Sequence, residues 1–237
     1  MDILGVRVDE VNMEEALTKA KSFFKTDTCD TIFTPNPEFI MTADKDKEFK
    51  KILNSSSLNI PDGNGIVWAS KKIGKPLNER VAGYDFIHKL FDYGKDNNIS
   101  FYFLGARPGV AEKARDKALQ MYPGLKIVGT CDGYFAKEDE EKIVKDISEL
   151  KPDVLLVALG SPKQEKFIND HKDKINSKIA IGVGGCFDVL SGETKRAPKI
   201  FIKLKLEWLY RGLTDIKRLK RLKAIPLFML KVKKHAK

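Results

Sequence analysis

Five segments of the 237-residue chain combine polar side chains with glycine or proline, as ligand-binding loops do. Each follows a short apolar run that is typical of a buried strand. In chain order they are TPNPEF (34–39), PDGNG (61–65), LGARPG (104–109), LGSPKQE (159–165) and GVGGCFDVLSGETKRAP (182–198). Ligands of open parallel sheets bind outside the carboxyl ends of the strands, so these loops are the expected site.

Asp62 is the residue of this set best suited to acid–base chemistry. It comes directly after an apolar run, in IPDGNG, so its carboxylate would project from the ligand-binding edge of the sheet. There it could accept a proton from a substrate hydroxyl as a general base. The alternative is structural, because Asp-Gly is a common turn pair and an Asp side chain can cap the next helix. The residues alone leave both interpretations open.

Four other side chains could bind a polar or anionic substrate at this edge. Arg80, in NERVAG, could pair with a phosphate in a fixed fork geometry, or it could be an ordinary surface arginine. The amide of Gln164 could bind a sugar hydroxyl, or it could cap a helix. Thr34 and Asn36 offer a hydroxyl and an amide that could orient a substrate.

Nucleotide and metal motifs are incomplete. GARPG could present backbone amides to a phosphate, but it lacks the GK[ST] of a Walker A loop, and Phe187 stands where GVGGCF would need a third glycine. A Rossmann dehydrogenase is therefore not expected. Asp44 and Asp46 form a DxD pair, but we expect them in the middle of a helix, in a solvated charged run. The three cysteines and three histidines show no metal-ligand spacing, so no metal or cofactor is expected.

The elements that position these loops alternate between strand and helix. Apolar patterns predict strands at 31–34, 57–60, 99–104, 126–130, 153–159 and 178–183, and helices at 12–25, 37–53, 63–73, 83–95, 109–121, 137–149 and 163–172. Continuous apolar strands between helices are typical of a parallel sheet that helices cover on both faces. The prediction is a Rossmann-like α/β domain over residues 1–194.

The net charge of +10 is concentrated at the C-terminus. Residues 195–237 contain 15 Lys and Arg but only two acids, whereas the rest of the chain sums to −3. We predict a basic amphipathic helical appendage there, with four apolar residues on one face: Leu206, Leu209, Leu213 and Ile216. Such a helix could dock on anionic lipid, or it could pack on the core with a solvated basic face. Without a membrane, its apolar face could also pair with a second copy of the chain.

Other classes of protein fit the sequence less well. The tail has no zinc-finger, helix-turn-helix or RNA-recognition signature and no aromatic stacking platform, so no nucleic-acid partner is expected. No run of 18 apolar residues is present, and from the first residues of the sequence we do not expect a signal peptide. We expect a cytoplasmic protein attached peripherally to the inner face of the cell membrane.

Taken together, the motifs TPNPEF, PDGNGIVW, ERVAG, FLGARPGV, LGSPKQE and GVGGCFDVLSGETKRAP resemble the WecG/TagA/CpsF family, glycosyltransferase family 26. They occur in the family's order over residues 1–195, and the likeness is greatest to the wall teichoic acid branch. The resemblance implies the Rossmann-like GT-E fold. It also implies inverting, metal-independent transfer of N-acetylmannosamine from UDP-ManNAc to the C4 hydroxyl of undecaprenyl-diphosphate-GlcNAc. Other members use donors such as UDP-ManNAcA, which remains an alternative.

The resemblance also assigns roles to residues. Asp62 matches the proposed general base of the family, and Thr34, Arg80 and Gln164 match active-site positions. The C-terminal appendage of such proteins is thought to close over the pocket and supply arginines. The matching positions in this chain are Arg211, Arg218 and Arg221.

Overall fold

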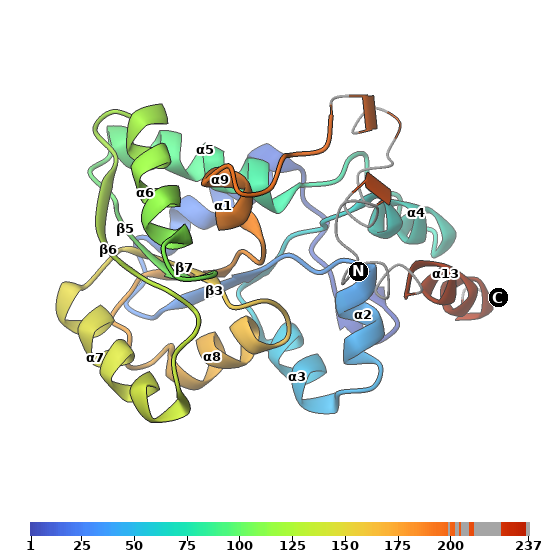
Figure 1. Cartoon of the computed structure of the whole chain (residues 1–237). Coiled ribbons are helices and arrows are strands. Elements are labelled where there is room, and N and C mark those ends of the chain that lie inside the picture. The colour runs from blue at the N-terminus through green and yellow to red at the C-terminus, as the bar shows by residue number, and fades with distance from the viewer. Residues whose placement is uncertain (199, 202–203, 205–208, 211–223, 236–237) are drawn as a thin grey trace.

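A six-stranded parallel sheet with helices on both faces forms the centre of the protein, which confirms the predicted α/β class (Figure 1). The computed structural model describes residues 1–198, 200–201, 204, 209–210 and 224–235. The spatial order of the strands is β4-β3-β8-β7-β5-β6. Their bounds are β3 Asp30–Phe33, β4 Leu58–Asn59, β5 Ser100–Gly105, β6 Lys126–Cys131, β7 Val154–Ala158 and β8 Ile179–Gly182. A separate antiparallel hairpin pairs β1 (Asp2–Ile3) with β2 (Val6–Arg7).

Two layers of helices enclose this sheet. In Figure 1, α1, α5, α6 and α9 cover one face, and α3, α7 and α8 cover the other. The helices described are α1 Met13–Phe23, α2 Pro37–Ala43, α3 Lys47–Ser55, α4 Asn64–Lys72, α5 Gly83–Asp96, α6 Val110–Met121, α7 Glu140–Leu150, α8 Lys163–His171, α9 Cys186–Leu190 and α13 Ala224–His235. A short 3₁₀ turn, Lys137–Asp139, precedes α7.

The strands show why the sheet is buried on both sides. In β7, Val154 and Leu156 pack into the cluster beneath α1, α5 and α6, while Leu155 and Val157 pack into the cluster beneath α3, α7 and α8. Successive side chains of a strand point to opposite faces, so a continuous apolar run serves both layers. Because all six strands are parallel, their carboxyl ends lie at one edge.

The single helix predicted over 37–53 is wrong, because the chain breaks into α2 and α3. Asp46 begins α3 by accepting a hydrogen bond from the Phe49 amide (2.9 Å), which also lowers the pKa of Asp46. Asp44 ends α2 and pairs with Lys231. The DxD pair is therefore not in the middle of a helix, as we had expected, but at two helix ends. Lys166 of α8 also reaches Asp46 (3.2 Å).

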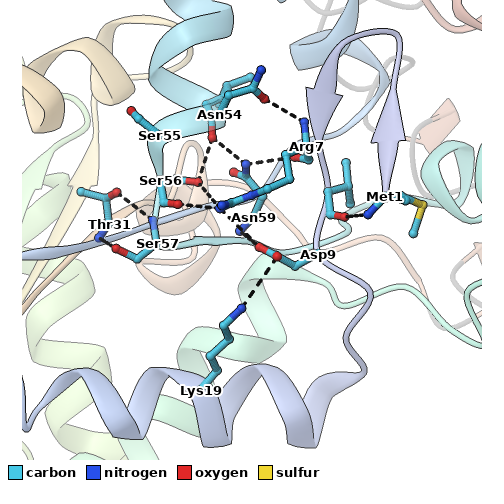
Figure 2. Close-up of polar contacts among 12 residues, drawn as sticks. Met1, Arg7, Asp9, Lys19, Thr31, Asn54, Ser55, Ser56, Ser57 and Asn59 are labelled. Carbon is cyan, nitrogen blue, oxygen red and sulfur yellow. Dashed lines mark hydrogen bonds and ion pairs between the residues drawn. The ribbon is translucent and has the colours of Figure 1, made fainter.

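A polar network fixes the edge strand β4 just before the PDGNG loop (Figure 2). Asn59 is fully buried and donates through Nδ2 to the carbonyl oxygens of Arg7 (3.0 Å) and Leu53 (2.6 Å). Its backbone N–H donates to Asp9 Oδ2 (2.7 Å), and the Asp9 N–H donates to the Asn59 carbonyl (3.0 Å). The N-terminal segment thus occupies the free edge of the sheet and holds β4 three residues ahead of Asp62.

The C-terminal helix α13 packs on the core, beside α2 and α4 (Figure 1). Phe228 and Val232 are buried in the same apolar cluster as α2, and Lys231 pairs with Asp44. Leu227 and Leu230 lie on the outer side, 44% and 65% exposed. This helix therefore packs on the core through one face, and its opposite face is exposed. The division into units 1–194 and 195–237 stays a prediction. Three of the four residues of the predicted apolar face, Leu206, Leu213 and Ile216, lie outside the described residues.

We predict that Phe228→Ala releases α13 from the core. Truncating a buried phenylalanine costs about 3–5 kcal/mol, and here the loss falls on one docked helix. Limited proteolysis should cleave the variant faster near the C-terminus while circular dichroism shows an intact core. Leu230→Ala is the matched control in the same helix and should be cut at the wild-type rate. Equal protection of both variants would contradict the packing of Phe228.

Candidate active site

Three of the predicted loops are joined by backbone hydrogen bonds beyond β3 and β4. The Asp62 N–H donates to the carbonyl of Pro35 (3.2 Å), which ties PDGNG to TPNP. The Val81 N–H donates to the carbonyl of Pro61 (2.9 Å), which ties ERVAG to the same loop. The loops that carry the predicted residues Thr34, Asp62 and Arg80 therefore meet, and each of these residues is partly exposed.

Glycines allow these loops to approach one another. A Cβ added at Gly65 would lie 2.4 Å from Pro37 Cγ, so the start of α4 fits against the start of α2 only without a side chain. A Cβ at Gly83 would lie 3.1 Å from Cγ2 of Thr34, which places the start of α5 against the TPNP loop. Three helices thus begin around Asp62, with their N-terminal ends at the site. Such ends favour negative charge, as on a diphosphate.

Asn36 has a structural function in this arrangement. Its Oδ1 atom accepts hydrogen bonds from the backbone N–H groups of Glu38 (2.9 Å) and Phe39 (3.1 Å), so it caps α2. The Nδ2 group is the part of Asn36 that a substrate could use. Asp62 directly precedes Gly63, which occupies the N-cap position of α4.

Gln164 lies beneath the surface rather than at it. Its side chain is 1% exposed, and its Oε1 atom accepts from the Gly184 N–H (2.9 Å). Its Nε2 atom donates to Oε1 of Glu165 (2.6 Å), which is fully buried. Burial raises the pKa of Glu165 to about 7, although hydrogen bonds from Gln164 and Ser161 favour the ionised form. Gln164 therefore stabilises the turn after β8 through its hydrogen bond with Gly184. Its side chain does not cap α8.

The loops after β5, β6 and β7 also meet at this edge. The Ala106 N–H donates to the Ala158 carbonyl (2.9 Å), and the Gly133 N–H donates to the Ala106 carbonyl (2.8 Å). Arg107 of GARPG is 58% exposed and reaches Asp188 (3.8 Å) and Glu193 (3.5 Å) beyond β8. Sequence reasoning noted the GARPG loop but missed this cation.

The basic tail begins on α5, next to ERVAG. The Arg196 guanidinium donates to Asp85 (2.7 Å) and lies over the ring of Tyr84, 4.9 Å from its centroid. This contact was also missed, because Arg196 is one of many cations in the sequence. The three predicted tail arginines, Arg211, Arg218 and Arg221, lie outside the described residues.

Comparison with known proteins identifies the family. A sequence profile described as "Glycosyl transferase WecG/TagA/CpsF family" matches residues 1–237. This chain belongs to the WecG/TagA/CpsF family. Similar proteins include the N-acetylglucosaminyldiphosphoundecaprenol N-acetyl-beta-D-mannosaminyltransferases of Staphylococcus aureus strains MRSA252 and NCTC 8325 / PS 47. Each is 38% identical over 236 residues, which cover 99% of this chain and 92% of the relative. The resemblance inferred from the motifs is confirmed.

Two further observations describe this WecG/TagA/CpsF protein. Among the residues for which the structure gives a position, no three His, Cys, Asp or Glu side chains are arranged to hold a metal ion. Within the same residues, no helix is long and apolar enough to cross a membrane.

We predict that Gly65→Ala destabilises this WecG/TagA/CpsF protein. Replacing a helical glycine by alanine normally stabilises a helix by about 0.5–1 kcal/mol, but overlap with the Pro37 ring adds a cost of about 1–3 kcal/mol. The melting temperature should therefore fall. Lys71→Ala, at an exposed position of the same helix, is the control and should melt like the wild type. A higher melting temperature for Gly65→Ala would show that α2 and α4 are not in close contact.

Proposed function

We propose that this protein is an N-acetylglucosaminyldiphosphoundecaprenol N-acetyl-beta-D-mannosaminyltransferase. It transfers N-acetylmannosamine from UDP-ManNAc to the C4 hydroxyl of GlcNAc in undecaprenyl-diphosphate-GlcNAc, and so forms the ManNAc-β-1,4-GlcNAc linkage unit of wall teichoic acid. The main support is the 38% identity, over 99% of the chain, with transferases of that name. The position of Asp62, where three loops meet, supports a single reactive centre.

Asp62 acts as the general base in the proposed mechanism. Its carboxylate accepts the proton of the C4 hydroxyl while that oxygen forms a bond to the anomeric carbon of the donor. The bond from this carbon to the diphosphate oxygen breaks, and UDP leaves with the electron pair. Because the attack and the departure occur on opposite faces, one displacement inverts the anomeric carbon. The proton on Asp62 then passes to solvent.

The departing UDP gains negative charge, which the protein must stabilise. In the proposed mechanism Arg80, on the loop that is hydrogen-bonded to PDGNG, pairs with the diphosphate, and the start of α4 adds its positive end. Arg211, Arg218 and Arg221 would supply further guanidinium groups when the tail covers the pocket. With these cations the reaction requires no metal ion and no cofactor.

The acceptor is a membrane lipid, so we propose that the tail brings the site to the membrane surface. The outer side of α13 supports this, because Leu227 and Leu230 are exposed beside Lys233 and Lys234. Exposed apolar residues followed by lysines suit a helix that lies on anionic lipid. The same helix packs on α2 and α4, whose first turns lie at Asp62.

Asp62→Asn should abolish transfer while the fold is retained. The amide keeps the shape of the carboxylate but cannot accept the proton, so the rate should fall by about 10²–10⁴-fold. The assay measures UDP release and disaccharide-lipid formation from UDP-ManNAc and a lipid-diphosphate-GlcNAc analogue in the presence of EDTA.

Asp96→Asn is the matched control for that assay, because Asp96 is exposed at the end of α5 remote from the site edge. It should transfer at the wild-type rate. Wild-type turnover by Asp62→Asn would remove Asp62 as the base and leave the transferase in place. Transfer by the wild type from UDP-ManNAcA but not from UDP-ManNAc would overturn the proposed donor, and loss of activity in EDTA would overturn metal independence.

Reversing the charge of the two outer lysines should weaken membrane binding. Each Lys near an anionic surface contributes about 1 kcal/mol, so Lys233→Glu with Lys234→Glu should lower the affinity for phosphatidylglycerol vesicles by about 30-fold or more. Lys142→Glu with Lys145→Glu changes the net charge equally on exposed positions of α7 and should bind as the wild type does. Equal weakening by both pairs would indicate a general charge effect, and no weakening by either would argue against α13 as the contact.

A further inference from the structure

A buried carboxyl group lies directly beneath the carboxyl edge of the sheet. Glu165 is in the first turn of α8 and is fully buried, although a glutamate is almost never buried without a charged partner. The groups that favour its ionised form are the amide of Gln164, the hydroxyl of Ser161 and its own backbone N–H. The adjacent Lys166 contacts Asp46 and Glu48 of α3 instead. The proposed mechanism does not use Glu165.

The geometry fixes which way the Gln164 amide faces. The Gly184 N–H can only donate, so the atom of Gln164 next to it must be the oxygen (2.9 Å). The nitrogen of the same amide must then face Glu165, where Oε1 accepts its hydrogen at 2.6 Å.

The two side chains also determine the position of the turn after β8. A Cβ added at Gly182 would lie 2.7 Å from Nε2 of Gln164 and 3.1 Å from Oε1 of Glu165, so both side chains press against the end of this strand. Gly184 follows with a φ of +52°, a conformation that favours glycine, and its N–H is held by Gln164. β8 is the neighbour of β3, which leads to Thr34, so this turn borders the site.

We propose that Glu165 is a positioning residue for the transfer reaction. Its ionised carboxylate holds the Gln164 amide in one orientation, and through that amide it holds the turn from Gly182 to Gly185 in the form that receives the substrate. The inference rests on the proposed function and adds to it a residue that acts through another. On protonation the carboxyl becomes a weaker acceptor, and the Gln164 amide is then held mainly by the Gly184 N–H.

This role predicts a pH dependence of defined sign. Burial raises the pKa of Glu165 from 4.5 to about 7, so the carboxylate forms as the pH rises through about 7 and is lost below it. Wild-type kcat should therefore fall on the acidic side with a midpoint near 7. Stability should change in the opposite sense, because the Glu165 carboxyl holds its proton more tightly in the folded chain than in the unfolded chain. The destabilisation by Glu165 therefore grows as the pH rises from 4.5 to about 7 and is complete above about 7.

The experiment compares Glu165→Gln, Gln164→Ala and the double variant with the wild type. It measures kcat and KM from pH 5.5 to 9 and melting temperatures at pH 8. Glu165→Gln should lower kcat about tenfold at pH 8, remove the acidic limb near pH 7 and melt at or above the wild-type temperature. In the Gln164→Ala background it should cause no further loss, since Glu165 acts through that amide. Asp170→Asn, at an exposed position of α8, is the control and should change neither quantity.

The outcomes separate this inference from the proposed function. An active wild type whose pH profile is unchanged by Glu165→Gln would overturn the inference alone. So would a parallel fall in melting temperature and activity, or losses from the two single variants that simply add, because these indicate a structural role. A wild type that transfers no sugar from any UDP donor would overturn the proposed function and this inference with it.

Discussion

Two backbone hydrogen bonds hold the candidate site together, and the rest of the structure serves to place them. The carbonyl of Pro35 accepts from Asp62, and the carbonyl of Pro61 accepts from Val81. Both acceptors belong to prolines, whose ring fixes φ and limits the movement of the loop. The parallel pairing of β3 with β4 brings the loops to the same edge, and the network around Asn59 holds β4 there. Without that pairing, Asp62 would have no fixed relation to Arg80 or Thr34.

Helices α2 and α4 connect the site with the C-terminus. Their first turns surround Asp62, while α13 packs against both of them through Phe228 and Val232. A displacement of α13 would therefore also move α2 and α4, the two helices that position the Asp62 carboxylate. Under the proposed function, the acceptor and the basic tail both belong at the membrane surface, so one helix could bind lipid on its outer side and support the site on its inner side.

The sequence predicts the sheet and the loops well because their signals are local. Continuous apolar runs identify the strands, and turn residues directly after them identify the edge where ligands bind. The break between α2 and α3 could not be read in the same way, since the 37–53 segment keeps a helical pattern and the break depends on Asp46 capping a new helix. The partners of Asp44 and Asp46 come from α13 and α8, far away in the sequence. The function of Asn36 as a helix cap was equally open until its contacts were known.

Glu165 shows that a local pattern can be present and still be misleading. Gln164 and Glu165 share a helical face with Phe167, Ile168 and His171, and all five are buried. The spacing predicts burial, but charged residues in the first turn of a helix are normally assigned to solvent and to the helix dipole. Burial of this acid lowers the stability of the fold at every pH above its ordinary pKa. Its place beneath the turn after β8 is therefore better explained by the amide that it orients than by any gain in stability.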